Sequence, residues 1–449
     1  MRDIKFISHD IYKRSSVAFA EYIPSHWSIH RIKDVIHGID QGWSPNAENR
    51  EVIENEWGVL KLSAINNGKY NENKHKALPI YEVPKHQYLV KRGDFLLTRS
   101  NTPDLVGECC LVTVEPTLKM MYSDLIYNLK INKRNSSDRY LNYFLSCESF
   151  RWLKRVSARG LNESMVKISQ GIIRGWNVFL PPISEQEDIA DYLDNKTEQI
   201  DRKIDLLTQK ARQYGNLKQS LINETVCRGL DRSVEMKESG IDWIRKMPKH
   251  WDLVPIRSLL ENRINKNVGN LHSDYLSLVA GIGVIPYAEK GNVGNKKPED
   301  LEKCKLVHPG DLVLNSMNFG IGSFGISRYK GVCSSVYIVM RPQNSDLGEY
   351  LYRIFQIKPF QMLVSSYGKG IMDIRMAIKW TDLKNIYVPY PPTQEQKAIA
   401  CFLDEKTAHI DLIIEAIHTQ IYKLKELRKT LINDIVTGKI KVPIEGVTI

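Results

Sequence analysis

The sequence lacks most patterns that would mark an enzyme, a secreted protein or a membrane protein. Its 7 cysteines are odd in number and form no C-x-x-C pair, which excludes a closed disulfide framework and fits a reducing cytoplasm. It has no G-x-x-x-x-G-K-S/T loop, no G-x-G-x-x-G after a strand, and no zinc-like spacing of cysteine and histidine. No uncharged apolar run reaches about 18 residues. We therefore expect no catalytic constellation, metal or cofactor in this chain, and neither secretion nor a membrane span.

What the sequence does contain is one long segment twice. Residues 181–226 recur as residues 391–436, and the ungapped copies agree at 18 of 46 positions. At 449 residues the chain is also too long for a single core. A repeat of this size, separated by long spacers, implies two structurally equivalent halves. The sequence therefore predicts a pseudo-twofold protein.

Each copy of the repeat has the pattern of a long helix. It opens on a double proline, which ends the preceding element. A capping box follows, formed by Ser184 with Glu187 and by Thr393 with Gln396. Beyond it, apolar residues keep an a/d heptad in the same phase in both copies. We expect two long helices that pack as an antiparallel coiled coil.

Each long helix is also expected to be interrupted near its start. We expect a break near Asp194 and near Asp404, with the long part beyond it. The main seam consists of Leu193, Ile200, Leu207, Tyr214 and Leu221 in the first copy, and of Leu403, Ile410, Ile417, Leu424 and Leu431 in the second.

The positive charge is confined to the segments between the repeats. Lys and Arg exceed Asp and Glu by 7 in residues 1–180 and by 6 in residues 231–390. Acidic residues lead by 2 in residues 181–230, and the charges balance in residues 391–449. Two basic modules joined by neutral or slightly acidic connectors are expected if each module meets a polyanion.

The two basic segments share a frame but little else. Both open on a Pro-x-His-Trp string that ends at Trp27 or Trp251. Both contain a Gly-Asp turn, at Asp94 and Asp311, that leads into an apolar strand. Short apolar runs punctuated by Asn and Gly indicate mixed modules with substantial β content. The His-Trp pairs are interpreted as packing residues.

These features together resemble the specificity subunit of type I restriction-modification systems, over essentially the whole chain. The resemblance depends on the module-helix-module-helix order, the Pro-Pro-x-x-Glu-Gln entry to each helix, the Pro-x-His-Trp openings and the Gly-Asp turns. It implies an α+β fold with two target recognition domains of mixed α/β character, separated by two long helices that form an antiparallel coiled coil. The expected parts are recognition domain 1 (1–180), helical spacer 1 (181–230), recognition domain 2 (231–390) and helical spacer 2 (391–449).

The resemblance also implies a function. It makes the chain a non-catalytic subunit that binds double-stranded DNA, with each recognition domain reading one half of a bipartite, asymmetric site. The helices would set the gap between the half-sites and dock the partners. The implied partners are two methyltransferase subunits and two ATP-driven restriction motor subunits, which would use S-adenosylmethionine, ATP and Mg²⁺. No role is implied for residues 439–449.

Candidate contact residues lie in loops that flank the shared strands. Arg suits guanine and Asn suits adenine by bidentate geometry, while Lys mostly contacts phosphate. The DNA-binding candidates are Asn66, Asn67, Lys69, Arg99, Ser100, Asn101, Lys296, Lys297, Asn315, Ser316, Asn318, Lys369 and Arg375. The candidates for spacing and partner docking are Glu185, Gln186, Leu193, Ile200, Leu207, Leu221, Glu395, Gln396, Leu403, Ile410, Ile417 and Leu431.

Two other classes of function stay open. A self-contained DNA nuclease or methylation enzyme could use one of the D/E-x-K triplets, such as those at Asp194 and Asp404, although such triplets are expected by chance in so charged a chain. Cleavage of plasmid by the purified chain with Mg²⁺ would favour it. A coiled-coil adaptor that binds only proteins would show no steep loss of duplex affinity with salt.

Overall fold

The computed structural model describes residues 8–162, 165–293, 296–317, 319–367 and 377–443. The chain divides into two compact units. Unit 1 comprises the residues up to Leu206 together with those from Gln420 onward, and unit 2 comprises Leu207–Thr419. Two long helices, α5 (Ile183–Arg228) and α9 (Thr393–Val436), therefore each contribute to both units.

A four-stranded antiparallel sheet forms the centre of the recognition part of unit 1. Its strand order is β11 (Cys109–Leu111), β9 (Phe95–Thr98), β13 (Ile126–Ile131) and β4 (Ile36–Gln41). The expected Gly-Asp turn precedes β9. Gly93 has φ +90°, which glycine adopts without strain, and Asp94 accepts a hydrogen bond from the backbone N–H of Lys91 at 2.8 Å. The side chains of β9 are all buried.

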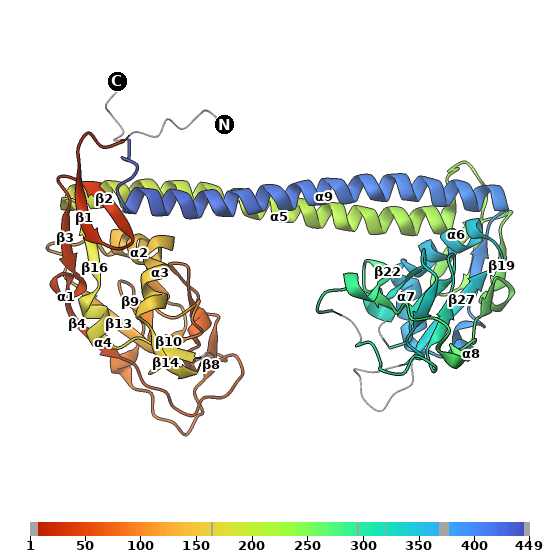
Figure 1. Ribbon diagram of the computed structural model, residues 1–449, viewed down its shortest axis with the longest axis horizontal. Coiled ribbons are helices and arrows are strands. Elements are labelled where there is room, and N and C mark those ends of the chain that lie inside the picture. Colours follow the sequence, from red (N-terminus) through yellow and green to blue (C-terminus); the bar gives the residue numbers. More distant parts are fainter. Residues whose placement is uncertain (1–7, 163–164, 294–295, 318, 368–376, 444–449) are drawn as a thin grey trace. The chain divides into compact units, whose positions relative to one another are not determined.

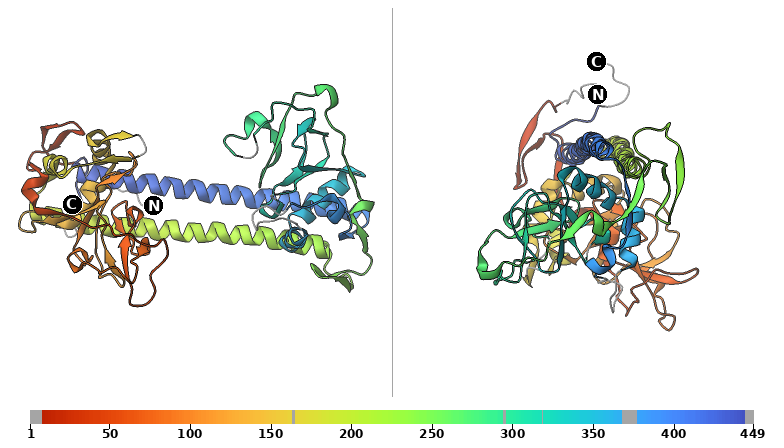
Figure 2. Two further views of the ribbon diagram at one scale, coloured as in Figure 1. Left: turned by 90° about the horizontal axis from the view of Figure 1, so that it is seen from below. Right: turned by 90° about the vertical axis from the view of Figure 1, so that its right-hand side faces the viewer.

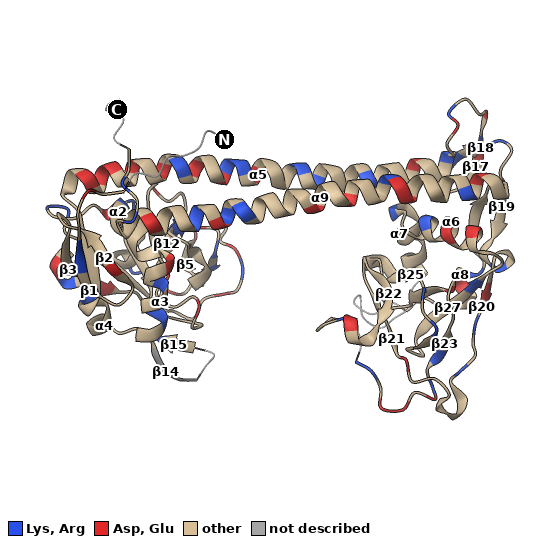
Figure 3. Cartoon of the chain, turned by 45° about the horizontal axis from the view of Figure 1, so that its top comes forward, with Lys and Arg blue, Asp and Glu red and all other residues tan. Residues whose placement is uncertain are grey.

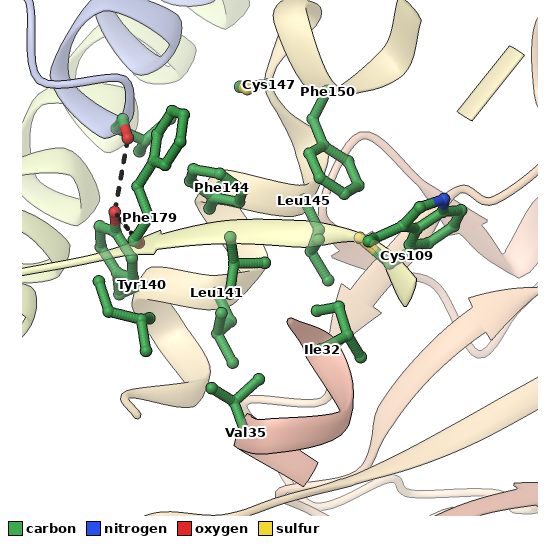
Figure 4. Packing of buried hydrophobic residues seen from close by; sticks show 14 of the residues in the cluster. Ile32, Val35, Cys109, Tyr140, Leu141, Phe144, Leu145, Cys147, Phe150 and Phe179 are labelled. Carbon is green, nitrogen blue, oxygen red and sulfur yellow. Dashed lines mark hydrogen bonds between the residues drawn. The ribbon is translucent and has the colours of Figure 1, made fainter. Parts of the chain in front are cut away.

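Helix α2 (Asp138–Ser146) packs on β11 of this sheet and on the following helix α3 (Glu148–Ser157), and Figure 4 shows buried residues of both helices close to Phe179. The side chain of Ser137 caps α2 by accepting from the N–H of Tyr140, which satisfies a free donor at the helix start. The buried face of α2 holds Tyr140 and Phe144, spaced i and i+4. Phe144 and Phe150 of α3 meet with ring centroids 5.4 Å apart. The core of unit 1 therefore contains an aromatic cluster among mainly aliphatic residues.

Smaller sheets and hairpins surround the central sheet of unit 1 (Figure 1). The remaining strands are β1 (Tyr12–Val17), β2 (Ala20–Pro24), β3 (Ser28–Arg31), β5 (Trp57–Leu60), β6 (Ile65–Asn66), β7 (Lys69–Tyr70), β8 (His75–Ala77), β10 (Ser100–Asn101), β12 (Lys119–Met121), β14 (Arg159–Asn162), β15 (Met165–Lys167) and β16 (Asn177–Leu180). The remaining helices are α1 (Ile32–Val35), α4 (Gln170–Gly175) and the 3₁₀ turns Leu62–Ala64 and His86–Tyr88.

Unit 2 repeats the frame of unit 1. Its four-stranded antiparallel sheet has the order β20 (Leu260–Asn262), β27 (Tyr337–Pro342), β24 (Leu312–Asn315) and β25 (Phe324–Ile326), which reproduces the sequence of strands in the first sheet. The turn before β24 is the same, because Gly310 has φ +89° and Asp311 accepts from the N–H of His308 at 2.8 Å. The predicted duplication of mixed modules is confirmed.

The other elements of unit 2 also follow the order of unit 1. The strands are β17 (Met236–Ile241), β18 (Ile244–Pro248), β19 (Asp252–Pro255), β21 (Leu276–Val279), β22 (Gly283–Pro286), β23 (Lys305–Val307), β26 (Gly331–Cys333) and β28 (Tyr387–Tyr390). The helices are α6 (Ser345–Phe355), α7 (Lys358–Ser366), α8 (Trp380–Leu383) and the 3₁₀ turns Ile256–Ser258, Val268–Asn270, Tyr287–Glu289 and Phe319–Ile321.

Within each unit, α5 and α9 lie side by side and run antiparallel (Figures 1 and 2). In unit 1, Arg428 of α9 pairs with Asp201 of α5 at 3.2 Å, and in unit 2, Lys218 of α5 pairs with Asp411 of α9 at 2.6 Å. The same number of residues separates the two pairs along each helix, so the register does not slip. The predicted antiparallel coiled coil is confirmed.

The heptad seam is also confirmed, more strongly in α9 than in α5. All five predicted seam residues of α9 are buried, whereas α5 buries Leu193 fully and leaves the other four half-buried. The predicted breaks are wrong. Asp194 and Asp404 both lie inside continuous helices of 46 and 44 residues. Each aspartate is instead paired with an arginine of its own recognition domain, Arg139 or Arg353, so the charge does not interrupt the helix.

The predicted helix starts are nearly right, but the capping residues are misplaced. Helix α5 begins at Ile183, one residue before Ser184, and α9 begins at Thr393 itself. Ser184 and Thr393 therefore lie in the first turn. In the same turn, the side-chain amide of Gln186 donates a hydrogen bond to the carbonyl of Pro181 at 2.9 Å. Gln396 donates to the carbonyl of Pro391 at 2.7 Å in the same way.

Candidate nucleic-acid interface

The first three DNA-binding candidates lie on the β6–β7 hairpin of unit 1. Asn66 and Lys69 are exposed and face each other across the hairpin. The Nζ atom of Lys69 donates to Asp201 of α5 at 2.6 Å. The backbone N–H of Asn67 donates to Glu108 at 2.7 Å. The hairpin is thus fastened to α5, and Lys69 would have to leave Asp201 to bind a phosphate.

The next three candidates follow β9. Ser100 is buried, and its hydroxyl donates to the carbonyl of Val166 at 3.1 Å. Asn101 accepts from the N–H of Thr102 at 2.9 Å. Arg99 is half-buried, with its guanidinium 5.9 Å from the centroid of the Tyr127 ring. Arg99 and Asn101 keep part of their side chains at the surface, whereas Ser100 is occupied in joining β10 to β15.

In unit 2, the candidates at the equivalent strand end are also occupied. Asn315 and Ser316 are buried. Asn315 accepts from the N–H of Met317 at 3.1 Å, and Ser316 donates to the carbonyl of Val336 at 2.9 Å. Lys296 is exposed at the surface. Lys297 is also exposed, and its Nζ atom lies 3.5 Å from a backbone carbonyl. The remaining candidates lie outside the described residues; they are Asn318, Lys369 and Arg375.

Each recognition domain has an open hollow at the same place in its frame. In unit 1 it lies beside the turn that precedes β13, and in unit 2 beside the turn that precedes β27. The first hollow, about 510 Å³, is lined by Ser44, Pro45, Asn46, Ala47, Val59, Leu60, Lys61, Leu62, Ser63, Lys76, Ser123 and Leu125. The second, about 620 Å³, is lined by Tyr275, Lys296, Pro298, Asp300, Lys303, Cys304, Met317, Ser334, Ser335 and Val336.

The equivalence of the hollows follows from the sheets around them. In unit 1, β12 runs parallel to β5, and in unit 2, Val332 of β26 forms a parallel bridge with Tyr275. The strand ends are tied in the same way, because Ile168 donates to the carbonyl of Arg99 at 2.9 Å and Ile378 to that of Ser316 at 3.0 Å. Both hollows therefore adjoin the same turn of the frame, although the other segments that line them differ.

The hollows contain basic residues that the sequence did not single out. Lys76 and Lys303 are exposed, and Lys61 is half-buried. Lys296 is the one residue lining a hollow that was also a sequence candidate. Lys61 directly follows β5 and Lys76 lies in the neighbouring strand β8, so no local motif joins them. Only the exposed Asn46, in a loop before β5, had a residue type that sequence reasoning favours for a base contact.

A duplicated contact joins each recognition domain to the first turn of a long helix. Glu185 accepts from the indole N–H of Trp27 at 3.0 Å and lies 2.8 Å from Nε2 of His26. Glu395 does the same with Trp251 at 2.9 Å and with His250 at 2.7 Å. Both tryptophans are buried, so their interpretation as packing residues is confirmed.

A buried tyrosine makes a second duplicated contact. Tyr140 lies 2.9 Å from the carbonyl of Phe179 and 3.4 Å from that of Val436 near the end of α9 (Figure 4). Tyr350 reaches the carbonyls of Pro389 and Val226 at 3.2 and 3.3 Å in unit 2. Burial raises the pKa of both hydroxyls well above the usual value, so they stay protonated donors.

The triplets suggested for a nuclease are used by the fold. Asp194 accepts from the hydroxyl of Tyr143 at 2.6 Å in addition to its pairing with an arginine. Lys196 lies 5.5 Å from the ring centroid of Tyr192, one turn earlier on α5. In α9, Lys406 lies 5.8 Å from the ring of Phe402 in the same way. In both triplets the acid and the lysine have separate partners, which leaves no converging pair for a catalytic metal.

The cysteines do not form a nucleophilic site. All but Cys401 are buried. Burial raises the pKa of Cys147 to about 11 and that of Cys227 to about 12, so these thiols are protonated near neutral pH. The thiolate is the reactive form of cysteine. Buried thiols with raised pKa values therefore serve packing rather than chemistry.

The candidates for partner docking divide by exposure. The glutamines and the leucine and isoleucine residues face the core or the helix pair, with Leu193, Leu403, Ile410, Ile417 and Leu431 buried and Ile200, Leu207 and Leu221 half-buried. These side chains pack against other residues of the same chain. Acidic and basic residues are both distributed along α5 and α9, with acidic residues gathered near the start of α5 (Figure 3). Docking of a partner at the predicted residues stays a prediction. Within the described residues, no helix combines the length and apolar character needed to cross a bilayer.

Comparisons with known proteins agree with this geometry. Residues 24–213 and 248–423 match the family model of the type I restriction modification DNA specificity domain. The MjaVIII type I restriction enzyme specificity subunit of Methanocaldococcus jannaschii is 24% identical over 446 residues, with 94% of each chain covered. The EcoEI specificity subunit of Escherichia coli is 34% identical over 175 residues, covering 38% of this chain and 29% of that protein.

The fold is also found among solved structures. A chain from a study of complex assembly and conformational transition in a type I restriction-modification system aligns with a TM-score of 0.67. It is 17% identical, and the alignment covers 93% of this chain and 99% of that chain. At this identity the similarity concerns the fold.

Proposed function

Because the chain belongs to the type I restriction-modification DNA specificity family, we propose that its two hollows are where the recognition domains read the two halves of a split DNA site. As a specificity subunit it binds DNA and is not itself catalytic. The nuclease and the protein-only adaptor are not favoured.

One observation carries the proposal: equivalent positions in a duplicated frame hold different polar linings. The first hollow offers Asn46, Lys61 and Lys76, and the second offers Lys296 and Lys303. A conserved function at both sites would explain the shared frame, and different half-sites would explain the different linings. Lysines would contact phosphate, while asparagine and serine side chains would contact base edges.

Recognition of one DNA site by two linked domains also has a physical reason. A good bidentate base contact discriminates by about 1 to 3 kcal/mol, so one small domain reads too little to single out a genomic site. Linking two domains raises selectivity through effective concentration. The gap between the half-sites is assigned to α5 and α9, since each is one continuous helix that contributes to both units.

The proposal extends to partners. Two methyltransferase subunits and two ATP-driven motor subunits would assemble on this chain, and they would use S-adenosylmethionine, ATP and Mg²⁺. The mixed charges on the outer faces of α5 and α9 are the proposed docking surface for the methyltransferases (Figure 3). Names of relatives as restriction enzyme subunits support such an assembly.

The test begins by mapping methylated adenines in DNA from a host that contains the chain with its methyltransferase. The map gives a duplex for measuring affinity against salt concentration. Replacing Lys61 and Lys76 by alanine should weaken binding and reduce the slope of log affinity against log salt by about 1 per lysine. Asn46→Ala should relax specificity at one half-site only. The exposed Lys203→Ala on α5 is the control.

The outcomes separate cleanly. Loss of discrimination at a single half-site by Asn46→Ala, with the other half-site unchanged, supports reading by the first hollow. Equal affinity, salt slope and specificity in all variants would refute it. Cleavage of plasmid by the purified chain with Mg²⁺ would instead support the nuclease.

A further inference from the structure

A second kind of site lies in unit 1, away from the proposed DNA surface. A cavity of about 410 Å³ lies where the segment before β1 meets the first turn of α5. Two histidines and three acidic residues are among its lining, together with one lysine. The lining comprises His9, Asp10, Ile11, Ser25, His26, Pro182, Ser184, Glu185, Asp188, Ile189, Ile440, Lys441 and Val442. The cavity therefore has an excess of acidic groups around its histidines.

His9 is the unusual residue in this cavity. Its exposed fraction is 7%, and its Nε2 atom is buried without a hydrogen-bond partner. A buried ring nitrogen left without a partner loses the free energy of a hydrogen bond to water. Burial also lowers the pKa of His9, so the ring is neutral near pH 7. The ring lies 5.6 Å from that of His26, centroid to centroid.

Three possible ligands of two types, imidazole and carboxylate, converge here. One ring nitrogen each of His9 and His26 and a carboxylate oxygen of Glu185 all lie within 4.8 Å of one another. Tetrahedral zinc, with bonds of about 2.0 to 2.2 Å, holds its ligand atoms roughly 3.3 Å apart. The 2.8 Å separation of His26 Nε2 from Glu185 Oε2 is slightly shorter, so small side-chain rotations would make room for an ion. This is the one such cluster among the described residues.

Unit 2 supplies an internal comparison, because it has the same histidine–glutamate pair but no residue equivalent to His9. Tyr12 pairs with Pro24 in β1–β2 as Met236 pairs with Pro248 in β17–β18. Three residues before Met236, Ser233 therefore occupies the position of His9, and its hydroxyl donates to Asp231 at 2.6 Å.

His250 and Glu395 keep the contact of His26 with Glu185, which therefore needs no metal. The histidine–glutamate pair serves the packing of both units. The addition of His9 distinguishes unit 1.

We propose that His9, His26 and Glu185 bind a divalent transition-metal ion of the zinc type, one per chain. Two imidazoles and one carboxylate are a ligand set that suits zinc, with the fourth position open to water. Asp10 and Asp188 line the same cavity and add negative charge, against the one positive charge of Lys441. The bound ion would link the segment before β1 to the start of α5 and so stabilise unit 1.

The test uses the untagged full chain in a Cys401→Ser background, which removes the exposed thiol. After dialysis against EDTA, isothermal titration with ZnCl₂ should show one site per chain, and MgCl₂ should show none. His9→Gln, which keeps a polar group in the cavity, should abolish this site. His26→Ala should do the same, whereas the matched variant His250→Ala in unit 2 should retain it.

Thermal unfolding distinguishes a lost ligand from a lost fold. In EDTA, the unsubstituted chain and His9→Gln should unfold at similar temperatures. ZnCl₂ should raise the midpoint of the former and leave that of the latter unchanged. The proposal is overturned if the chain binds no zinc at micromolar concentrations, or if His9→Gln binds zinc as well as the unsubstituted chain does. The DNA-binding assay is independent of this result.

Discussion

At the scale of residues, the duplication is a duplication of contacts. The glutamate that follows each double proline joins a tryptophan and a histidine of its own recognition domain, in both units. The buried tyrosines join a strand carbonyl to a helix carbonyl, again in both. A carbonyl near a helix end has no partner within the helix, so each tyrosine satisfies an acceptor that would otherwise be buried unpaired.

Removing one tyrosine hydroxyl should weaken only its own unit. Tyr140→Phe leaves two buried carbonyls without this donor, and we expect a loss of about 1 to 3 kcal/mol in the free energy of unfolding. Hydrogen exchange followed by mass spectrometry should show faster exchange in unit 1. Tyr350→Phe should do the same in unit 2, and the exposed Tyr22→Phe is the control. Faster exchange in both units after either substitution would show that the contacts are not separate.

At the scale of elements, glycines define how the long helices end. Gly229 follows α5 and Gly438 follows α9, with φ of +76° and +77°. In a left-handed conformation, glycine closes a helix without strain. A Cβ added at Gly229 would meet Trp251, and one at Gly438 would meet Pro24 and Trp27. The glycines are one position apart in the repeat, yet both helix ends pack against the equivalent tryptophan.

Alanine substitutions in the helices should have opposite effects according to position. Gly215 lies inside α5 with no atom within 4 Å of an added Cβ, so Gly215→Ala should stabilise by about 1 kcal/mol. Gly438→Ala should destabilise by more than about 1 kcal/mol, because its φ is positive and Pro24 blocks the methyl group.

Midpoints of thermal unfolding check both changes. The methyl group added by Gly229→Ala approaches the ring of Trp251 at 3.1 Å, which is less severe than the clash with Pro24. Gly229→Ala should therefore lose less stability than Gly438→Ala. A Gly438→Ala protein as stable as the unsubstituted chain would contradict the assigned role of the glycine.

At the scale of the whole molecule, two units are built on one frame and joined by two helices. Equivalent central sheets, turns and helix contacts recur, whereas the smaller sheets and the linings of the two hollows differ. The register of the helices, held by the pairs of Asp201 with Arg428 and Lys218 with Asp411, is common to both units.

Lengthening both helices by one heptad should change the DNA site. Seven residues inserted after Gln209, with seven more after Gln420, preserve the seam and add about 10 Å of helix. At 3.4 Å per base pair, this should lengthen the accepted gap by about three base pairs or abolish binding. Methylation mapping of the variant with its methyltransferase gives the answer. An unchanged gap would contradict the assignment of spacing to these helices.

Most of the fold was predictable because its signals are local and repeated. The heptads, the double prolines and the Gly-Asp turns predicted both helices and the strands that follow Asp94 and Asp311. The predicted breaks at Asp194 and Asp404 are wrong because both aspartates lie at the exposed side of a continuous helix and pair with an arginine of the recognition domain. Those partners, Arg139 and Arg353, are more than 50 positions away in sequence.

The candidate site was less predictable. Strand ends are visible in the sequence, but their exposure is not, and Ser100, Asn315 and Ser316 turned out to be buried. Contact of the other described candidates with DNA stays a prediction. Lys61 and Lys76 line the same hollow from neighbouring segments of one sheet. His9 and Glu185 are close in space although almost the whole recognition domain separates them in sequence. No spacing rule could have joined these residues.

The sequence by itself determined the duplication and the two long helices, because a repeat and a helix periodicity can both be seen in the order of residues. The antiparallel pairing of the helices was expected from the duplication and the matched heptads. Only the tertiary structure decided which polar side chains reach the surface and which distant groups converge. Burial and convergence depend on how strands from separate parts of the chain pack, and that packing is set by contacts far apart in sequence.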